Sequence, residues 1–265
     1  MKISVLSSGS KGNSSIILSH KSNQSILIDQ GLSAKKLLER VDYIGADYKD
    51  LMGIVITHDH SDHIGGAGIL SRKLKIPVYI HKENYYSKEE KFNNCEVFFI
   101  DDMSEKKNSI DSDFFIGDFK VTPFVIPHDG SVNRAYNIAI DDKKITHLTD
   151  LGMVTTLVKQ KLKGSDLIVL ESNHDLELLK NGPYPWYLKQ RVKGRHGHLS
   201  NENACTLMNE YDCPKLKKVI LAHLSETNND PFLAYDLMDK TNCEISRKFE
   251  LLVAKQHEAL ELIEV

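Results

Sequence analysis

Three histidines and two aspartates fall within six residues, in the segment His58-Asp59-His60-Ser61-Asp62-His63. Imidazole nitrogens and carboxylate oxygens are ligands that zinc-type divalent cations take in proteins. Residues two apart in an extended or turning segment point roughly the same way, so His58 and His60 can share one cation. Asp62 and His63 are adjacent and face another direction, which suits a second cation nearby. Without cations, these groups would need full solvation or many partners, so the spacing predicts a metal site.

Each cation would still lack ligands, and three further candidates stand where strand-like runs end. They are His128, Asp150 and His223. A carboxylate can bridge two cations, so Asp150 is the natural shared ligand. We predict one cation held by His58, His60 and His128, a second held by Asp62, His63 and His223, and Asp150 between the two. A histidine at a strand end is by itself more often an ordinary hydrogen-bonded residue, as we expect for His147, so the assignment depends on the 58–63 spacing.

The composition is that of an ordinary globular protein. Of the 265 residues, 41% are apolar and 27% are charged, and the formal net charge is −3. A chain that is not a polycation needs a local basic face to bind nucleic acid. The first residues carry too short an apolar run for a signal peptide, and no stretch approaches the roughly 20 apolar residues of a membrane helix. The cysteines are widely spaced and form no CxxC motif, so we expect reduced thiols in a cytoplasmic protein that does not act at a membrane.

The remaining pattern alternates strand-like and helix-like segments, as in an α/β protein. Strands are predicted at residues 3–6, 15–18, 25–29, 53–56, 78–80, 97–100, 119–126, 135–140, 144–148, 167–170 and 218–221. Helices are predicted at 34–41 after the N-cap Ser33, at 68–75, 155–162 and 175–180, and at 201–211 after the N-cap Ser200. Residues 97–148 are expected to form a strand-rich meander with a turn at 141–142. Since no low-complexity linker interrupts the chain, we expect one domain over residues 1–265.

A weak duplication runs through this pattern. The strands before Asp29 and Asp150 both end in an aspartate, with a glycine two residues later. The strands before His58 and His223 both end in a histidine. Two halves of this kind suggest two similar layers that face each other. Such layers would collect four polar side chains at one edge.

The segment THDHSDH, residues 57–63, resembles the THxHxDH signature of the metallo-β-lactamase superfamily. Asp29, the 58–63 cluster, His128, Asp150 and His223 follow one another in the order of that family's motifs. The resemblance implies an α/β fold of the metallo-β-lactamase type, a four-layer αββα sandwich with a two-metal site at one edge. It also implies two divalent metal ions, zinc or manganese, with iron as an alternative.

Softer motifs resemble one branch of this superfamily, the YycJ (WalJ)-like exonucleases. They are SSGSKGNSS, PHDG, LTDLG, ESNHD, NGPYPWYLKQR, GHLSN and AHLSETNN. Two departures from other branches narrow the class. The zinc β-lactamases commonly have a cysteine where this chain has Asp150. The flavin-linked di-iron branch typically has a glutamate where this chain has His60, so a hydrolytic site is favoured over a redox site.

The predicted centre keeps a net positive charge, since two aspartates and a bridging hydroxide offset only part of the charge of two cations. Such a centre favours an anionic substrate and a charged transition state. Asp29 resembles the family's first-motif aspartate and is expected to hold a ligand histidine or position the water. Asp59 could do the same, or could be a solvated loop residue. His198 resembles a histidine that contacts the scissile phosphate in related nucleases, so we predict that it serves the leaving oxygen; the alternative is a histidine of a capping loop.

A basic segment leads directly to His198. Residues 189–198 carry four formal positive charges and no carboxylate, and Tyr184, Trp186 and Tyr187 come just before them. Basic residues with neighbouring aromatic rings suit a nucleic-acid backbone and its bases, although charge runs are more often simply solvated. The loop at residues 7–14 could present N–H groups to a phosphate, or could be a plain turn. His174 also ends a strand and could border the site.

Three hypotheses follow. The first is a dinuclear-metal phosphodiesterase that acts on nucleic acid, DNA rather than RNA, as a 5′→3′ exonuclease with a bridging hydroxide as the nucleophile. The second is a metallohydrolase of small thioesters, lactones or cyclic phosphodiesters. The third is a metal-stabilised binding protein without turnover. The basic segment and His198 favour the first. Since no long inserted segment is present to clamp a substrate, a partner or a homodimer could supply the grip.

Overall fold

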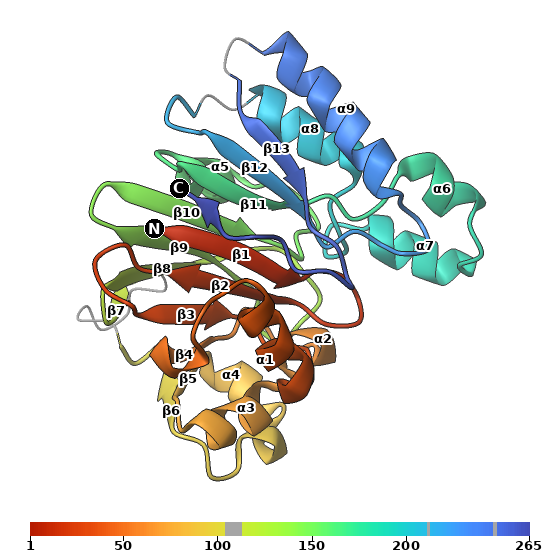
Figure 1. Ribbon diagram of the computed structural model, residues 1–265. Helices are drawn as coiled ribbons and strands as arrows, with labels where there is room; N and C mark the ends of the chain where they lie inside the picture. Colours follow the sequence, from red (N-terminus) through yellow and green to blue (C-terminus); the bar gives the residue numbers. More distant parts are fainter. Residues whose placement is uncertain (104–112, 211–212, 246–247) are drawn as a thin grey trace.

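Two β-sheets pack face to face, and helices cover their outer faces (Figure 1). The computed structural model describes residues 1–103, 113–210, 213–245 and 248–265. Each sheet has seven strands in the described residues, in the orders β14-β1-β2-β3-β4-β5-β6 and β13-β12-β11-β10-β9-β8-β7. The two chain termini lie next to each other, because β14 pairs antiparallel with β1. The predicted α/β sandwich is confirmed.

The first sheet contains β1 (Lys2–Ser7), β2 (Ser14–Leu18), β3 (Ser25–Ile28), β4 (Leu51–Val55), β5 (Val78–Ile80), β6 (Val97–Phe99) and β14 (Ile263–Glu264). The second contains β7 (Phe114–Ile116), β8 (Phe119–Val125), β9 (Arg134–Ile140), β10 (Lys143–Leu148), β11 (Leu167–Glu171), β12 (Lys218–Ala222) and β13 (Glu250–Val253). The helices are α1 (Ala34–Tyr43), α2 (Ser61–Ile64), α3 (Ala67–Leu74), α4 (Lys82–Tyr86), α5 (Thr156–Leu162), α6 (Leu176–Asn181), α7 (Trp186–Lys193), α8 (Asn201–Glu210) and α9 (Pro231–Glu244), with 3₁₀ turns η1 (Tyr48–Asp50) and η2 (Glu89–Phe92).

Alternation along the strands explains the layers. In β3, Ile26 and Ile28 belong to the apolar cluster between the two sheets, whereas Leu27 belongs to the cluster beneath α1 and α3. In β11, Val169 faces the other sheet and Ile168 faces α5 and α8. Strands covered on both faces read as continuous apolar runs, and successive side chains point to opposite faces. The core is therefore three stacked apolar layers.

The central strands place their carboxyl ends at one edge of the sandwich. β3 to β6 run parallel to one another, and so do β10 to β13. The loops that follow these strands therefore lie at the same edge of each sheet. Ligands in α/β sheets bind outside the carboxyl ends of such strands. Every predicted site residue except His198 lies in the segment that follows one of the strands β3, β4, β8, β10 and β12.

The predicted duplication has a structural counterpart at two glycines. Any Cβ at Gly31 would lie 1.7 Å from the carbonyl oxygen of Asp62, and any Cβ at Gly152 would lie 2.2 Å from that of Arg195. Both positions therefore require glycine, because another segment of backbone passes against them. Each glycine lets the loop after an aspartate-ending strand approach a segment that carries site residues.

One predicted strand was assigned to the wrong sheet. Residues 97–99 form β6, which pairs parallel with β5 in the first sheet, so the expected meander over 97–148 is wrong at its start. The antiparallel meander is β7 to β10. A strand pattern records which faces are buried but not which sheet receives the strand, and the chain changes sheets after β6.

The helices include several that the sequence pattern did not indicate. α7 and α9 were not predicted, and α7 buries none of its residues, so no apolar stripe marks it. The helix expected at 201–211 is α8, and its expected last residue, Tyr211, lies outside the described residues. Within the described parts of the chain, no helix combines the length and apolar character needed to cross a bilayer. The four cysteines are free.

Candidate metal centre

Three of the predicted site residues lie at strand ends where the backbone turns sharply. Asp29, Asp150 and His223 follow β3, β10 and β12, and all three have positive φ angles of 60°, 58° and 55°. A non-glycine residue rarely adopts this left-handed conformation, and such residues concentrate at functional sites.

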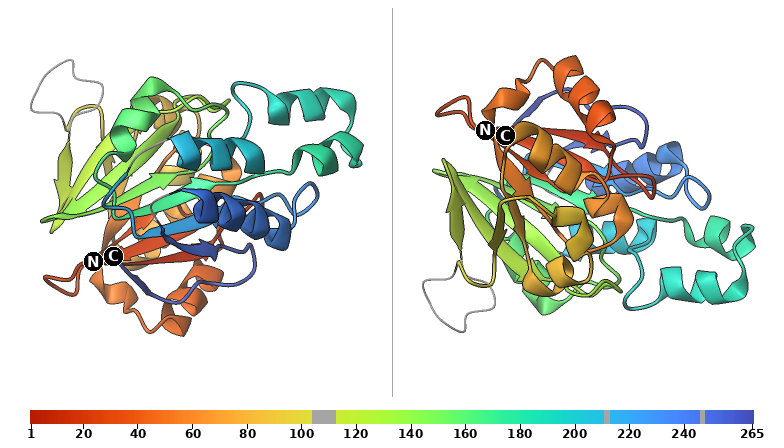
Figure 2. Two further views of the ribbon diagram at one scale, coloured as in Figure 1. Left: turned by 90° about the horizontal axis from the view of Figure 1, so that it is seen from above. Right: turned by 90° about the horizontal axis from the view of Figure 1, so that it is seen from below.

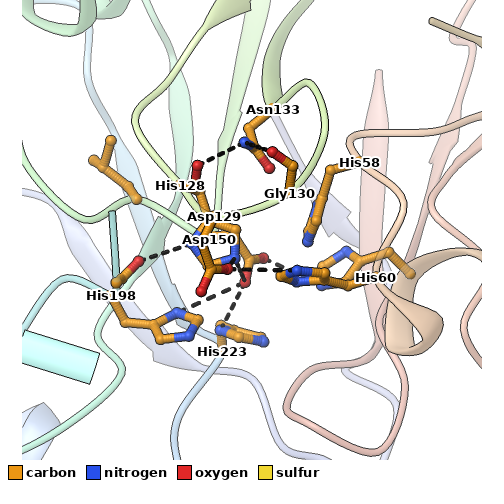
Figure 3. A network of polar contacts seen from close by, with 12 residues as sticks. His58, His60, His128, Asp129, Gly130, Asn133, Asp150, His198 and His223 are labelled. Atoms are coloured by element: carbon orange, nitrogen blue, oxygen red, sulfur yellow. Dashed lines mark hydrogen bonds and ion pairs between the residues drawn. The ribbon is translucent and has the colours of Figure 1, made fainter. Parts of the chain in front are cut away.

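The first predicted ligand group is brought together. His58, His60 and His128 have ring centroids 4.5 to 5.2 Å apart, and their ligating nitrogens lie within 4.8 Å of one another. Figure 3 shows the three rings converging beside Asp150. His58 and His60 come from the loop after β4, whereas His128 comes from the loop after β8. A cation at this point would have three imidazole nitrogens available.

The second group lies beside the first. Asp62, His63 and His223 form another cluster whose ligating atoms lie within 4.8 Å of one another. Asp150 stands between the clusters, since its Oδ2 is 3.2 Å from His63 Nε2 and its Oδ1 is 3.6 Å from His128 Nε2. The structure thus brings all seven predicted ligands into two adjoining groups. Asp150 has the place that a bridging carboxylate would need.

The outer nitrogens of these rings are held by hydrogen bonds. The pairs are His58 Nδ1 with Thr57 Oγ1 at 2.9 Å, His63 Nδ1 with Asp29 Oδ2 at 2.7 Å, His128 Nδ1 with the carbonyl of Gly197 at 2.8 Å, and His223 Nδ1 with Glu171 Oε1 at 2.9 Å. Acceptors on Nδ1 place the hydrogen there and leave the Nε2 lone pair toward the centre. Metal-binding histidines are usually oriented in this way.

The inner atoms fit a cation. The Nε2 atoms of His58, His128 and His223 and the Oδ2 atom of Asp150 are buried and form no hydrogen bond within the described chain. Buried polar atoms without a hydrogen bond are costly and rare. Four of them in the two adjoining groups, all nitrogen or carboxylate donors, are what divalent cations would satisfy.

The charges of the cluster are strongly coupled. Burial lowers the pKa values of His58 and His128, so these imidazoles are neutral and able to ligate. Burial opposes the cationic form of His223 too, but Asp150, Asp62 and Glu171 outweigh it and raise its pKa to about 10. Despite burial, the neighbouring histidines lower the pKa values of Asp62 and Asp150. In the absence of cations, protons on histidines thus neutralise part of the anionic charge.

Asp29 and Asp59 occupy different surroundings. Asp29 is 1% exposed, and its carboxylate accepts hydrogen bonds from the N–H and the hydroxyl of Thr57 as well as facing His63. Asp59 accepts hydrogen bonds from Ser87 Oγ and from both the N–H and the hydroxyl of Ser131. Asp29 therefore supports the histidine loop directly, whereas Asp59 fastens that loop to the neighbouring 128–133 loop.

Glu171 is a site residue that the sequence did not indicate. It ends β11, is fully buried, and accepts four hydrogen bonds: His198 Nδ1 at 2.8 Å and His223 Nδ1 at 2.9 Å on Oε1, and the N–H groups of Leu151 at 2.7 Å and Leu199 at 3.0 Å on Oε2. Burial opposes its ionisation, but these partners, above all His198, lower its pKa. The available signal was its position, because β11 lies between the strands that end at Asp150 and His223.

His198 lies at the centre, as predicted from the order of motifs. Its Nδ1 is 3.7 Å from Asp150 Oδ1, and its ring centroid is 4.9 Å from that of His128 and 5.2 Å from that of His223. Its hydrogen bond to Glu171 uses Nδ1, and its Nε2 has no hydrogen-bond partner among the described residues. His174, by contrast, is buried, and its backbone carbonyl accepts the N–H of Asn201 at the start of α8.

A cleft of about 200 Å³ opens above these residues. Its walls come from the N-terminal loop, the 223–228 loop and the segment that includes α7; its lining residues are Ser10, His60, Asp62, Asp129, Asp150, Asn173, Tyr184, Leu188, Arg191, Val192, Gly197, His198, His223, Ser225 and Asn228. Figure 2 shows α6 and α7 projecting beyond the sheets at this end. The cleft is thus bounded partly by the predicted basic segment.

The loop at residues 7–14 behaves as a turn. The N–H of Gly9 donates to Asn13 Oδ1, that of Lys11 to Gln256 Oε1, and that of Asn13 to the carbonyl of Asp62. These groups are therefore already used within the protein, which favours the plain-turn alternative over a phosphate cradle. Ser10, at its tip, still lines the cleft.

Comparison with known proteins agrees with this geometry. The family model described as the β-lactamase superfamily domain matches residues 24–224. The chain belongs to the metallo-β-lactamase superfamily. Exodeoxyribonuclease WalJ of Streptococcus pneumoniae (strain D39 / NCTC 7466) is 35% identical over 237 residues, which cover 89% of this chain and 86% of that one. Exodeoxyribonuclease YycJ of Bacillus anthracis is 35% identical over 236 residues, covering 88% and 86%.

These relatives place the chain in the YycJ-like branch of the superfamily, as the motifs indicated. A solved structure, zinc-bound PqqB from Methylobacterium extorquens, superposes with a TM-score of 0.71 over 98% of this chain and 100% of that one, at 13% identity. That similarity supports the metallo-β-lactamase fold. Membership of the superfamily together with the two relatives named exodeoxyribonucleases makes this chain a metal-dependent hydrolase.

Proposed function

We propose that this protein is a nuclease that uses two divalent cations, zinc or manganese, to hydrolyse DNA from an end in the 5′→3′ direction. The observation that carries the proposal is the joint placement, in one cleft, of two ligand clusters, the Asp150 carboxylate between them and the Glu171–His198 pair beside them. The two relatives named exodeoxyribonucleases support a nuclease, and their name supports DNA. The direction rests on the motif resemblance to their branch.

Cations bound at the two clusters would generate a nucleophile from water near neutral pH and neutralise phosphoryl oxygens during displacement. The chain's own residues prepare the site for this. Asp29 holds His63, and Glu171 holds His223, so both rings are fixed before substrate arrives. The Asp62 and Asp150 carboxylates offset only part of the charge of two cations, which leaves an attraction for an anionic diester.

His198 is suited to protonate the leaving oxygen. Its Nδ1 is held by Glu171 Oε1 at 2.8 Å, and its side chain, which lines the cleft, is 21% exposed. An acid positioned in this way contributes about 10²- to 10⁴-fold in rate. Glu171 is then a positioning residue that acts through His198 and His223. Asp59 acts more indirectly, because it holds the 128–133 loop against the 58–63 loop and forms no hydrogen bond with His198 or His223.

The test is turnover by protein loaded with zinc or manganese. The substrates are DNA and RNA labelled at the 5′ or the 3′ end, and a panel of thioesters and lactones. We expect DNA shortening, with the 5′ label released first as mononucleotide. Asp150→Asn is the matched inactive control, because it removes the shared carboxylate charge without changing the size of the side chain. Intact DNA and RNA together with rapid turnover of a small ester would overturn the proposal in favour of a small-molecule hydrolase.

A further inference from the structure

Arg191 is the one lysine or arginine among the described residues that line the cleft. It lies on α7, and Tyr184, Leu188 and Ser10 of the N-terminal loop line the cleft with it. Its side chain is 60% exposed. The other cations of the segment, Lys193 among them, lie outside the lining. An anion that enters the cleft therefore meets a single fixed guanidinium besides the metal centre.

A carboxylate of the centre positions this guanidinium. Arg191 Nε donates to Asp129 Oδ2 at 2.5 Å, and Asp129 Oδ1 lies 3.4 Å from His60 Nε2 and 3.5 Å from His128 Nε2. Figure 3 shows Asp129 beside the histidines of the first cluster. Asp129 thus faces the predicted ligands with one oxygen and Arg191 with the other. The position of the guanidinium is tied to the centre through one side chain.

The hydrogen bond to Asp129 uses only Nε. A guanidinium has five N–H donors, and within the described parts of the chain the two terminal nitrogens of Arg191 have no hydrogen-bond partner, so they are left for another acceptor. Two N–H groups in a planar fork match two oxygens of a phosphate, and such bidentate contacts are strong and directional. The ion pair to Asp129 meanwhile fixes the orientation of the guanidinium and does not occupy the N–H groups of its terminal nitrogens.

We propose that Arg191 binds a phosphate of the nucleic-acid substrate next to the one that is cleaved. This inference rests on the proposed nuclease function and adds the residue that holds the substrate backbone in register. α7 buries none of its residues, so its sequence is not set by core packing. Helix spacing puts Leu188 and Arg191 three residues apart on one face, toward the cleft, and leaves Trp186 and Lys193 elsewhere on the helix surface.

The experiment measures binding of short single-stranded DNA by fluorescence anisotropy. Metal-loaded protein in the slow His198→Ala background is used, so that substrate survives. A neutral methylphosphonate replaces one linkage at a time at the three linkages nearest the 5′ end. Arg191→Ala is expected to bind unmodified DNA about tenfold more weakly, as for loss of one charge-assisted contact. The slope of log K against log salt should fall in magnitude by about 0.7.

The decisive readout is coupling between residue and linkage. At one linkage, the methylphosphonate should weaken binding about tenfold with Arg191 present and less than twofold with alanine there, because both changes remove the same contact. Lys193→Ala is the matched control, with the same loss of charge on the same helix but outside the cleft. It should show no linkage-specific coupling. Arg191→Lys keeps the charge and provides a second variant if the alanine variant folds poorly.

Additive effects at all three linkages would overturn the role of Arg191, and equal behaviour of Arg191→Ala and Lys193→Ala would do the same. In either case, DNA digestion by the wild-type protein would leave the nuclease function standing. Failure of the wild-type protein to bind or digest nucleic acid would instead remove both proposals. The two failures are therefore distinguishable.

Discussion

Replacing Glu171 with glutamine should change the metal centre without touching a predicted ligand. The carboxylate accepts two imidazole N–H groups on one oxygen and two backbone N–H groups on the other. Glutamine has one acceptor oxygen and one NH₂ group, so one of these pairs must face a donor. If the NH₂ faced Leu151 and Leu199, two buried backbone N–H groups would be unsatisfied, at about 1–3 kcal/mol each.

The NH₂ group should therefore turn toward the imidazoles, which can change tautomer. His223 would then accept on Nδ1 and carry its hydrogen on Nε2, the atom that faces the centre. To ligate a cation it must move that hydrogen back against the NH₂ group, at a cost of about 1–3 kcal/mol for a buried mismatched pair. At 1.4 kcal/mol for each factor of ten, we expect the second cation to bind roughly 10- to 100-fold more weakly.

The assay is metal titration followed by mass-spectrometric metal counting, with unfolding in denaturant measured in parallel. Asp166→Asn is the matched control, because Asp166 is a 4% exposed carboxylate just before the other end of the same strand, where it accepts the N–H of Lys144. The control should lose stability but keep both cations. If Glu171→Gln bound both cations as tightly as wild type, the proposed tautomer control by Glu171 would be refuted.

Three further expectations follow. His198→Ala should keep its metal content and lose about 10²- to 10⁴-fold in kcat on DNA. The loss should be much smaller on bis(p-nitrophenyl) phosphate, because the leaving group of that substrate needs no proton. An equal loss on both substrates would contradict the role of His198 as an acid. Asp59→Asn should lower the free energy of unfolding by about 1–3 kcal/mol through its bonds to Ser87 and Ser131, with little change in metal number, as measured by denaturation and metal counting. Burial lowers the pKa of His147 to about 4, below the usual 6.5, so its stabilising contribution is present above pH 6.5 and is lost as the pH falls toward 4, by at most about 3 kcal/mol. In the presence of a chelator, His147→Gln should therefore lose less of its free energy of unfolding than the wild type between pH 6.5 and pH 4. An unchanged dependence of the free energy of unfolding on pH would contradict this expectation.

The sequence predicted the strands with long buried apolar runs, and it missed α7, which buries none of its residues. Each of the strands β3, β4 and β11 consists mostly of buried apolar residues, so its apolar run is recognisable in the sequence. α7 has no buried residue and therefore no apolar period to detect. The misplaced β6 had a correct strand pattern, but pairing partners are set by contacts between distant segments. Local patterns do not contain that information.

The site residues likewise include some that a local pattern predicts and others that depend on the fold. The 58–63 loop could be predicted as a metal site because its spacing is local, and the structure gathers all seven predicted ligands around it. Glu171 could not be found by residue type, since an acid after an apolar strand is common at surfaces. Only the order of strands, with β11 between β10 and β12, puts it beside two histidines. The contact between Arg191 and Asp129 could not be predicted either, because it too depends on how distant segments of the chain pack together.

Backbone strain indicates why the centre sits at this edge. Three of the six described non-glycine residues with positive φ are Asp29, Asp150 and His223, and each follows a different strand. A left-handed residue costs of order 1–3 kcal/mol, which ordinary turns avoid by using glycine. At Gly31 and Gly152, two residues after Asp29 and Asp150, the chain does have glycine, because neighbouring backbone leaves no room for a side chain there. At the three strained positions the chain instead keeps a side chain that reaches the centre, so the packed sandwich stabilises an arrangement that its loops alone would not adopt.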